Sequence, residues 1–370
     1  MKNFLKVFWI LFVSLLFTTS CGDFSFNLNV ENPEHPSDEI LAKTTPLFNN
    51  AGTILNRWYL TVHGYVGPGM MLKTMADVAT CSWGMFGVNN MSSEPRKAWN
   101  NNSNYPYSRA TENYFDRLYK LLADANELIK FAEISSENED ADLVLLMGKV
   151  GQAFSVGYLS LVFDRVWISD ENGMVGENPV DYKQGMTWAL QKLDEAIELA
   201  TTKQISVPET WLPGGGGSNE RFVAFLNSMG ARMMVGNLRN KAQKENIDWN
   251  RVLNYTNNGL ATDFEIYMDD ETWYDLLNTY MVYPGWARVD MRIVHMMDPN
   301  TPDYWTDDIE MLPESMSDDA RLATDYQYLS NNNFRPTRGK YHFSSYRYSR
   351  LDYYISEWTT NLVEFSLSEN

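Results

Sequence analysis

The chain has 370 residues, of which 44% are hydrophobic and 14% are aromatic, so it can bury a substantial core in one large or two medium domains. Its formal net charge of −18 repels phosphate backbones and therefore disfavours nucleic acid as a partner. Its two cysteines exclude a disulfide framework and its four histidines lack metal-binding spacing, so the sequence indicates neither a metal nor a cofactor.

Residues 1–20 predict a targeting segment rather than a part of the fold. Lys2 and Lys6 supply positive charge, and the apolar run at 7–17 is too short to span a bilayer as a mature helix. Small residues precede Cys21, as in a bacterial lipobox, so we expect Cys21 to become the mature N-terminus and to carry lipid. At about 0.8 kcal/mol per buried CH₂, several acyl chains hold a protein stably on a membrane. The alternative is an ordinary signal peptide in which the cysteine is incidental.

The next segments predict a tether and then the first helix. Residues 21–36 are polar, contain two prolines and show no period, which favours an extended tether. Ser37 favours a helix N-cap, and apolar residues recur at helical spacing from there to Trp58. Pro46 lies inside this pattern, so we expect a break or kink at that position.

A second helix is predicted at 70–80, and an aperiodic stretch follows it. Residues 81–107 mix glycine, proline and asparagine with aromatic side chains and have no helical period. We therefore expect a long loop, and long structured loops in compact domains are often functional.

The strongest helical pattern runs from residue 110 to residue 258. Apolar stripes at steps of three and four residues predict helices at 110–133, 141–161, 182–200, 219–238 and 249–258. Asn219 and Asp248 favour N-caps, Gly259 favours a stop, and 168–180 reads as a polar loop between two long helices. A helical hairpin cannot bury its apolar face alone, so this pattern predicts stacked hairpins.

From Leu260 onward the helical period largely fails. Residues 263–313 are rich in Tyr, Trp, Asp and Pro, and residues 341–354 are dense in aromatic side chains. We expect loops, short strands and irregular turns there. The sequence therefore predicts one mainly α domain at 37–370, with a helical scaffold at 37–260 and an irregular, loop-rich part with little strand at 261–370.

Several segments are informative through their order, although no single one is specific. They are a leader ending at Cys21, NPEHPSDEILA at 32–42, an Asn-Ser-x-x-x-Arg helix at 227–232, IDWNRVLNYTNNGL at 247–260, PGWARVDMRIVHMMDP at 284–299 and YRYSRLDYYISEW at 346–358. In this order the chain resembles the SusD/RagB family of outer-membrane nutrient-binding lipoproteins, over most of its length.

The resemblance implies a fold of tetratricopeptide-like helical hairpins that support an irregular half. It implies a lipid-anchored protein at the cell surface of a Gram-negative bacterium, without catalytic activity. Such proteins cap a SusC-like TonB-dependent transporter and pass it oligosaccharides or, in the RagB branch, peptides. In family members an acidic residue followed by asparagine, like Glu369-Asn370, is commonly followed by another helix. The resemblance therefore also implies a C-terminal truncation here.

Two regions combine flat aromatic faces with amide and charged side chains, a mixture that suits sugar rings and their hydroxyls. The resemblance places family binding sites in the same two parts of the chain. The early region supplies Asp77, Trp83, Asn89, Asn90, Arg96, Trp99, Asn100 and Asn102, and the late region supplies Trp273, Tyr280, Tyr283, Trp286, Arg288 and Asp290. We predict ligand binding by all of these early residues except Asn102, and by Tyr283 and Trp286. Trp188 and Trp249 lie on predicted helices and are assigned to packing.

Other functions remain open at this point. A secreted glycosidase needs two carboxylates across a cleft, and 48 acidic residues leave that possibility open by number alone. Helical repeats also serve as scaffolds that bind other proteins. Aromatic and amide side chains suit peptides as well as oligosaccharides, so the nature of the cargo is open too.

Overall fold

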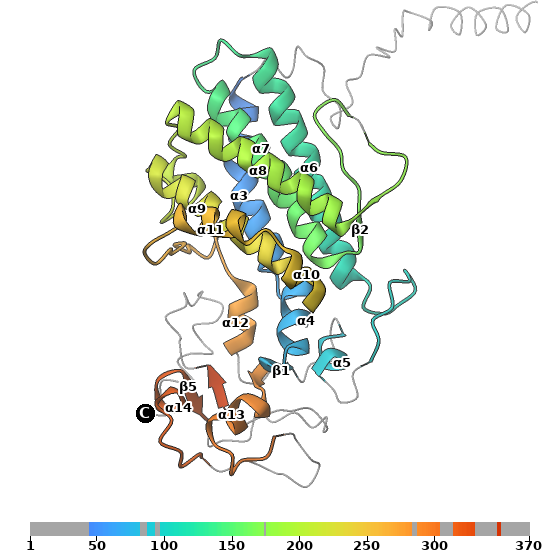
Figure 1. Cartoon of the computed structure of the whole chain (residues 1–370), viewed down its shortest axis with the longest axis vertical. Helices are drawn as coiled ribbons and strands as arrows, with labels where there is room; N and C mark the ends of the chain where they lie inside the picture. Colours follow the sequence, from blue (N-terminus) through green and yellow to red (C-terminus); the bar gives the residue numbers. More distant parts are fainter. Residues whose placement is uncertain are drawn as a thin grey trace, which may run out of the picture. The chain divides into compact units, whose positions relative to one another are not determined.

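Figure 1 shows the computed structural model, which describes residues 44–81, 87–92, 97–173, 175–282, 287–303, 314–329 and 346–348. The described chain is 59% helix and 7% strand, which confirms the predicted mainly α class with little strand. The leader, Cys21, the tether and Ser37 lie outside the described residues, so they stay predictions.

Helix α7 (Ala141–Val162) is the centre of the helical scaffold. It packs against α6 (Arg109–Ile134) on one side, α8 (Tyr182–Lys203) on the other, and α3 (Thr44–Val62). Figure 1 shows α6, α7 and α8 side by side. Among the described helices α7 alone is long and apolar enough to cross a membrane, but 83% of that apolar window is buried. Core packing therefore explains its composition.

The connection between α7 and α8 is a loop, as predicted, but short strands close its base. Strand β2 (Arg165–Val166) pairs antiparallel with β3 (Val180–Asp181). Asp181 then caps α8, because its carboxylate accepts hydrogen bonds from the backbone N–H groups of Lys183 and Gln184, both at 2.9 Å.

The next hairpin is formed by α9 (Asn219–Gly236) and α11 (Trp249–Asn257), which pack together. Asp248 caps α11, as predicted. The predicted cap of α9 was wrong by one residue. Ser218 Oγ accepts from the backbone N–H of Arg221, whereas the Asn219 amide donates to carbonyls at the end of α8. A short helix that the sequence did not predict, α10 (Lys241–Asn246), lies between them.

Two predictions near the N-terminal side of the scaffold were wrong. Among the described residues, α3 runs as one helix from Thr44 through Pro46 to Val62, so the predicted break at Pro46 is not present. Helix α4 (Pro68–Met75) ends before the predicted limit of residue 80, and β1 (Ala79–Cys81) follows it.

One packing assignment was also wrong. Trp249 is 43% exposed on α11, because the buried side of that helix is formed by Val252 and Tyr255. Trp188 on α8 is half-buried, with the Lys192 ammonium 5.6 Å from its ring centre.

The second half consists of short elements, as expected from the loss of helical period. They are α12 (Leu276–Val282), β4 (Ala287–Val289), α13 (Met291–Met297), α14 (Ala320–Thr324), β5 (Tyr326–Tyr328) and β6 (Tyr346–Tyr348), with α5 (Val88–Ser92) joining them from the first half. Strand β5 pairs antiparallel with β6, and β4 pairs antiparallel with β1. The β1–β4 ribbon joins the two regions that the sequence singled out.

Candidate ligand-binding surface

The β1–β4 ribbon brings together the two regions that the sequence singled out. In its register Ala79 lies opposite Val289 and Cys81 lies opposite Ala287. The early region leaves the ribbon at Cys81, and the late region enters it at Ala287. The points at which the two regions attach are therefore direct neighbours. Residues 82–86 and 283–286, which include Trp83, Tyr283 and Trp286, lie outside the described residues.

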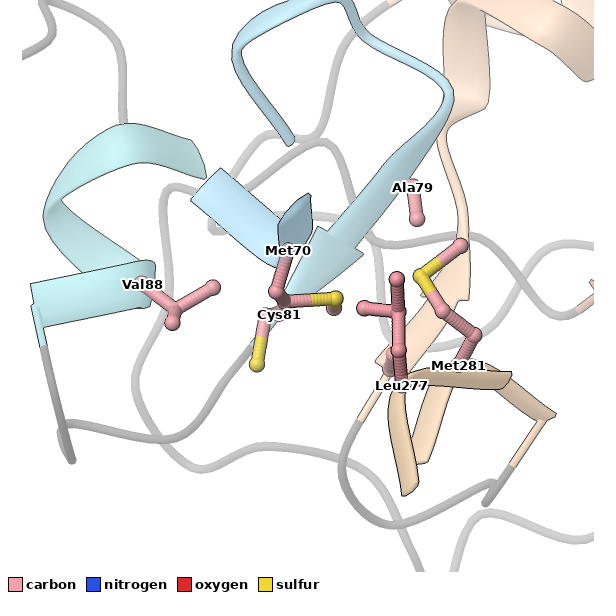
Figure 2. Close-up of a cluster of buried hydrophobic side chains, with 7 residues drawn as sticks. Met70, Ala79, Cys81, Val88, Leu277 and Met281 are labelled. Carbon is pink, nitrogen blue, oxygen red and sulfur yellow. The ribbon is translucent and has the colours of Figure 1, made fainter. Parts of the chain in front are cut away.

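An apolar cluster holds the ribbon in place beneath these attachment points. Figure 2 shows its side chains converging from α4, β1, α5 and α12, and its buried members are Met70, Ala79, Cys81, Val88, Leu277, Met281 and Ala287. The rings of Tyr65 and Tyr280 stack on each other with their centroids 4.5 Å apart, and both pack against this cluster. Cys81 is a buried cysteine in this apolar setting, which favours a packing role.

Aromatic rings gather on the early region at Trp99. The ring of Tyr105 meets that of Trp99 edge-on at 4.9 Å, and Tyr107 meets Tyr105 edge-on at 5.4 Å. All three rings are half-buried. Gly87 has a φ of 73°, and a Cβ there would lie only 2.9 Å from the Trp99 ring, so glycine is what permits this close approach.

The ring of Trp99 is held by packing on a buried apolar cluster. It packs against the buried cluster of Met71, Met91 and Ala110, and its indole N–H is buried without a hydrogen-bond partner among the described residues. Packing on this cluster orients the indole, and the remaining exposed part of the ring can meet an apolar surface.

Three exposed asparagines, at 100, 102 and 104, follow Trp99 in the sequence. Asn100 Oδ1 accepts from the backbone N–H of Asn102, and Asn102 Oδ1 accepts from that of Asn104, both at 2.9 Å. These are Asx-turns, so the side-chain oxygens shape the backbone and the amide NH₂ groups remain available as donors. We call Trp99, Tyr105, Tyr107 and the asparagines at 100, 102 and 104 the Trp99 surface.

Asp77 lies at the other end of the ribbon from Cys81. It has a left-handed φ of 55°, and its carboxylate forms an ion pair with Arg292 on α13. Asn90 accepts a backbone hydrogen bond from Lys97 at 3.3 Å. Arg96 and the side chain of Asn89 lie outside the described residues. Of the predicted ligand-binding side chains, Trp99 and Asn100 therefore lie together on the described surface.

Three late residues that the sequence offered as binding candidates are buried. Trp273, Arg288 and Asp290 are only 2–3% exposed, so they support the fold. Asp290 Oδ1 accepts from the backbone N–H of Arg292 and caps α13, while Oδ2 accepts from Thr80 Oγ1 at 3.1 Å. This carboxylate ties the ribbon to the following helix.

Sequence reasoning missed a polar cluster at Asp275, which links α3 to the start of α12. Asp275 Oδ2 accepts from Tyr59 Oη and His63 Nδ1 at 2.9 Å and from the Asn278 amide at 2.6 Å. Burial alone would raise the pKa of Asp275, but hydrogen bonds led by His63 outweigh it and hold the pKa below its usual range. The backbone N–H of Asn278 also donates to Asp275, a capping pattern visible in the sequence. The partners on α3 had no sequence signal.

No protein-family model matches the chain, and no curated protein matches it. Among the described residues, no group of three or more His, Cys, Asp or Glu side chains is placed to hold a metal ion. The chemistry of the described surface is thus that of aromatic faces and amide donors.

Proposed function

We propose that this protein binds nutrient oligosaccharides at the cell surface and delivers them to a SusC-like TonB-dependent outer-membrane transporter. The observation that carries the proposal is the Trp99 surface, where half-exposed rings lie beside exposed asparagine amides. The C–H faces of sugars pack on such rings, and sugar hydroxyls accept from such amides. The order of sequence segments that resembles the SusD/RagB family supports the same function.

The composition of the surface supports binding without catalysis. Residues 97–107, which carry the rings and amides, contain no aspartate or glutamate. Glycoside hydrolysis ordinarily requires two carboxylates on either side of the bond that is cut. A segment that carries rings and amides but no carboxylate suits a protein that holds its ligand and releases it unchanged.

The proposed location rests on Cys21. Lipid on this residue would hold the protein on the outer membrane, beside a membrane-embedded transporter. Replacing Cys21 by Ser in the full chain should abolish lipid attachment and release the protein from membranes. Mass spectrometry of the mature N-terminus and membrane fractionation measure both effects. A Cys21→Ser protein that still carries lipid at its N-terminus would contradict the anchor.

A ligand screen on the intact mature protein tests the binding function. Neutral oligosaccharides and peptides of matched length are titrated separately, and each sample is then analysed for cleavage products. We expect binding to an oligosaccharide without cleavage. Binding only to peptides would show that the cargo is a peptide and not an oligosaccharide. Release of cleavage products would contradict the non-catalytic function. Co-purification with an outer-membrane barrel from the native host tests delivery.

A further inference from the structure

The Trp99 surface and the charges beside it offer a ligand more hydrogen-bond donors than acceptors. The Oδ1 atoms of Asn100 and Asn102 each accept a backbone hydrogen bond at 2.9 Å, so part of their acceptor capacity is used within the Asx-turns. The NH₂ groups of these exposed side chains make no hydrogen bond to a described residue. A sugar hydroxyl both donates and accepts, whereas an ionised carboxylate only accepts. Surplus donors therefore favour a ligand with acidic groups.

Two cations supply most of these donors. Lys97 and Arg109 are exposed, and neither side chain forms an ion pair or a hydrogen bond with a described residue. Residues 97–111 contain no aspartate or glutamate, in a chain that has 48 acidic and 30 basic residues. The next carboxylate is that of Glu112 in the first turn of α6, and it makes no ion pair with Arg109 in the described structure. The segment is therefore locally cationic on a protein of net charge −18.

The buried cluster on which Trp99 packs also fixes where the two cations start. Ala110 belongs to this cluster and directly follows Arg109 in the chain. The backbone N–H of Lys97 donates to the carbonyl of Asn90 at 3.3 Å, and the next residue of α5 belongs to the same cluster. Consecutive Cα atoms lie about 3.8 Å apart, so the backbone of each cation is held beside the support of the indole.

The two rings nearest to the cations along the chain lie together. A Cβ on Gly87 would lie 2.9 Å from the Trp99 ring and 3.0 Å from the Tyr107 ring, so both rings flank the same point. Lys97 is two residues before Trp99, and Arg109 is two residues after Tyr107. The cations therefore flank one aromatic group, and their long side chains can reach a ligand that lies on it.

We propose that the Trp99 surface selects acidic oligosaccharides, whose carboxylate or sulfate groups bind Lys97 and Arg109 while a sugar ring packs on Trp99. This inference rests on the proposed function, because it names the class of sugar that the same surface binds. A guanidinium fork matches two oxygens of an acidic group, and an ammonium adds a charge-assisted hydrogen bond. The acidic remainder of the chain repels such a ligand, so a preference for it requires a local cationic site.

Calorimetric titration of the full mature protein tests the inference by comparing charged and uncharged forms of one sugar. One pair of probes is trigalacturonate and its trimethyl ester, and the other is a sulfated galactotriose and galactotriose itself. We expect one of the two acids to bind about tenfold more tightly than its uncharged form, with an affinity that falls as salt rises. The pair with the larger difference identifies the acidic group as carboxylate or sulfate.

The same titrations separate this inference from the proposed function. If the uncharged sugars bind and neither acid binds more tightly than its uncharged form, the inference is overturned and the proposed function stands. If none of these sugars binds and the ligand screen finds no other oligosaccharide, the proposed function itself fails. Tighter binding of an acid supports both, because the net charge of −18 alone would disfavour that acid.

Variants assign the preference to the named cations. Lys97→Gln and Arg109→Gln should each reduce the ratio of acid affinity to uncharged-sugar affinity about threefold, since each removes one exposed charge. Lys120→Gln and Arg117→Gln on α6 are the matched controls, because these two residues are also exposed and make no ion pair with a described residue. An affinity ratio in the Lys97 and Arg109 variants that equals the ratio in the controls would refute the site.

Discussion

Asp275 shows at the scale of one residue how the loop-rich part is held to the scaffold. Its carboxylate joins Tyr59 of α3 and His63, which directly follows that helix, to Asn278 of α12. Helix α12 leads directly into the late region that meets the ribbon. A largely buried carboxylate that accepts from several donors is costly to remove, because all of these hydrogen bonds are lost together.

We expect Asp275→Asn to lower the free energy of unfolding by about 2 kcal/mol at pH 7. The pKa of Asp275 is lowered by folding, so its stabilising effect is complete above the pKa of an unfolded Asp and is lost as pH falls through the depressed folded value. The difference between wild type and variant should therefore shrink below about pH 4.

Urea unfolding at pH 7 and pH 3 measures that difference. Asp116→Asn is the control, since Asp116 is exposed on α6 and makes no bond with a described residue. A loss that is the same at both pH values would show that the charge of Asp275 has no part in it.

Residue-scale predictions from sequence succeeded where the signal is local. Asp248 was correctly predicted as the N-cap of α11, because capping depends only on residues at the start of that helix. The exposure of Trp249 and the burial of Trp273, Arg288 and Asp290 depend on neighbours distant in the sequence, and these were misjudged. Trp99 was singled out because its surroundings are aperiodic and polar, and it lies on a half-exposed surface.

At the scale of elements, the start of α8 provides a direct test of capping. Asp181 accepts two backbone hydrogen bonds there, whereas Asp140 at the start of α7 makes no side-chain cap bond. Asp181→Ala should therefore cost about 1 kcal/mol of stability, and Asp140→Ala much less. Thermal unfolding of both variants makes the comparison. Equal losses would mean that the Asp181 cap bonds contribute nothing.

The close packing of α7 on α6 can be tested in the same way, by substituting a glycine at the contact. A Cβ on Gly148 would lie 2.6 Å from Ile129 Cγ1 and 3.0 Å from the carbonyl oxygen of Ala125. Alanine normally favours a helix over glycine by about 1 kcal/mol, but overpacking costs about 1–3 kcal/mol. We expect Gly148→Ala to destabilise the protein by a net 1–2 kcal/mol or so.

Gly176→Ala is the control for this packing effect. Gly176 lies in the loop between α7 and α8, and a Cβ there would meet only the Asn178 carbonyl at 3.4 Å, an ordinary contact. Chemical denaturation should show a change within about 0.5 kcal/mol for this variant. A stabilised Gly148→Ala protein would contradict the tight α6–α7 contact.

The long helices were predictable because each carries its own apolar stripe. The predicted 110–133 helix corresponds to α6, Arg109–Ile134, within one residue at either end. The three-residue strands β1 and β4 were not predictable, since each is too short for a period and its partner lies far away in the sequence. The pairing that joins the two candidate regions is therefore information that only the folded chain supplies.

At the scale of the whole molecule, stacked helices form a support, and the proposed binding surface lies on the loop between α5 and α6. The apolar cluster in Figure 2 and the Asp275 cluster both join the base of the loop-rich part to the scaffold. Such an arrangement lets surface residues vary while their positions remain fixed. The central claim is that the Trp99 surface on this support binds the ligand.

Titration of the oligosaccharide selected by the screen against Trp99→Ala tests that claim most directly. We expect affinity to fall about 30-fold, or about 2 kcal/mol, because the central ring of the surface is removed. Trp99→Phe, which keeps an aromatic ring on the Met71 cluster, should retain most of the affinity. Trp249→Ala, at an exposed tryptophan on α11, should bind like wild type. A folded Trp99→Ala protein with wild-type affinity would contradict the account.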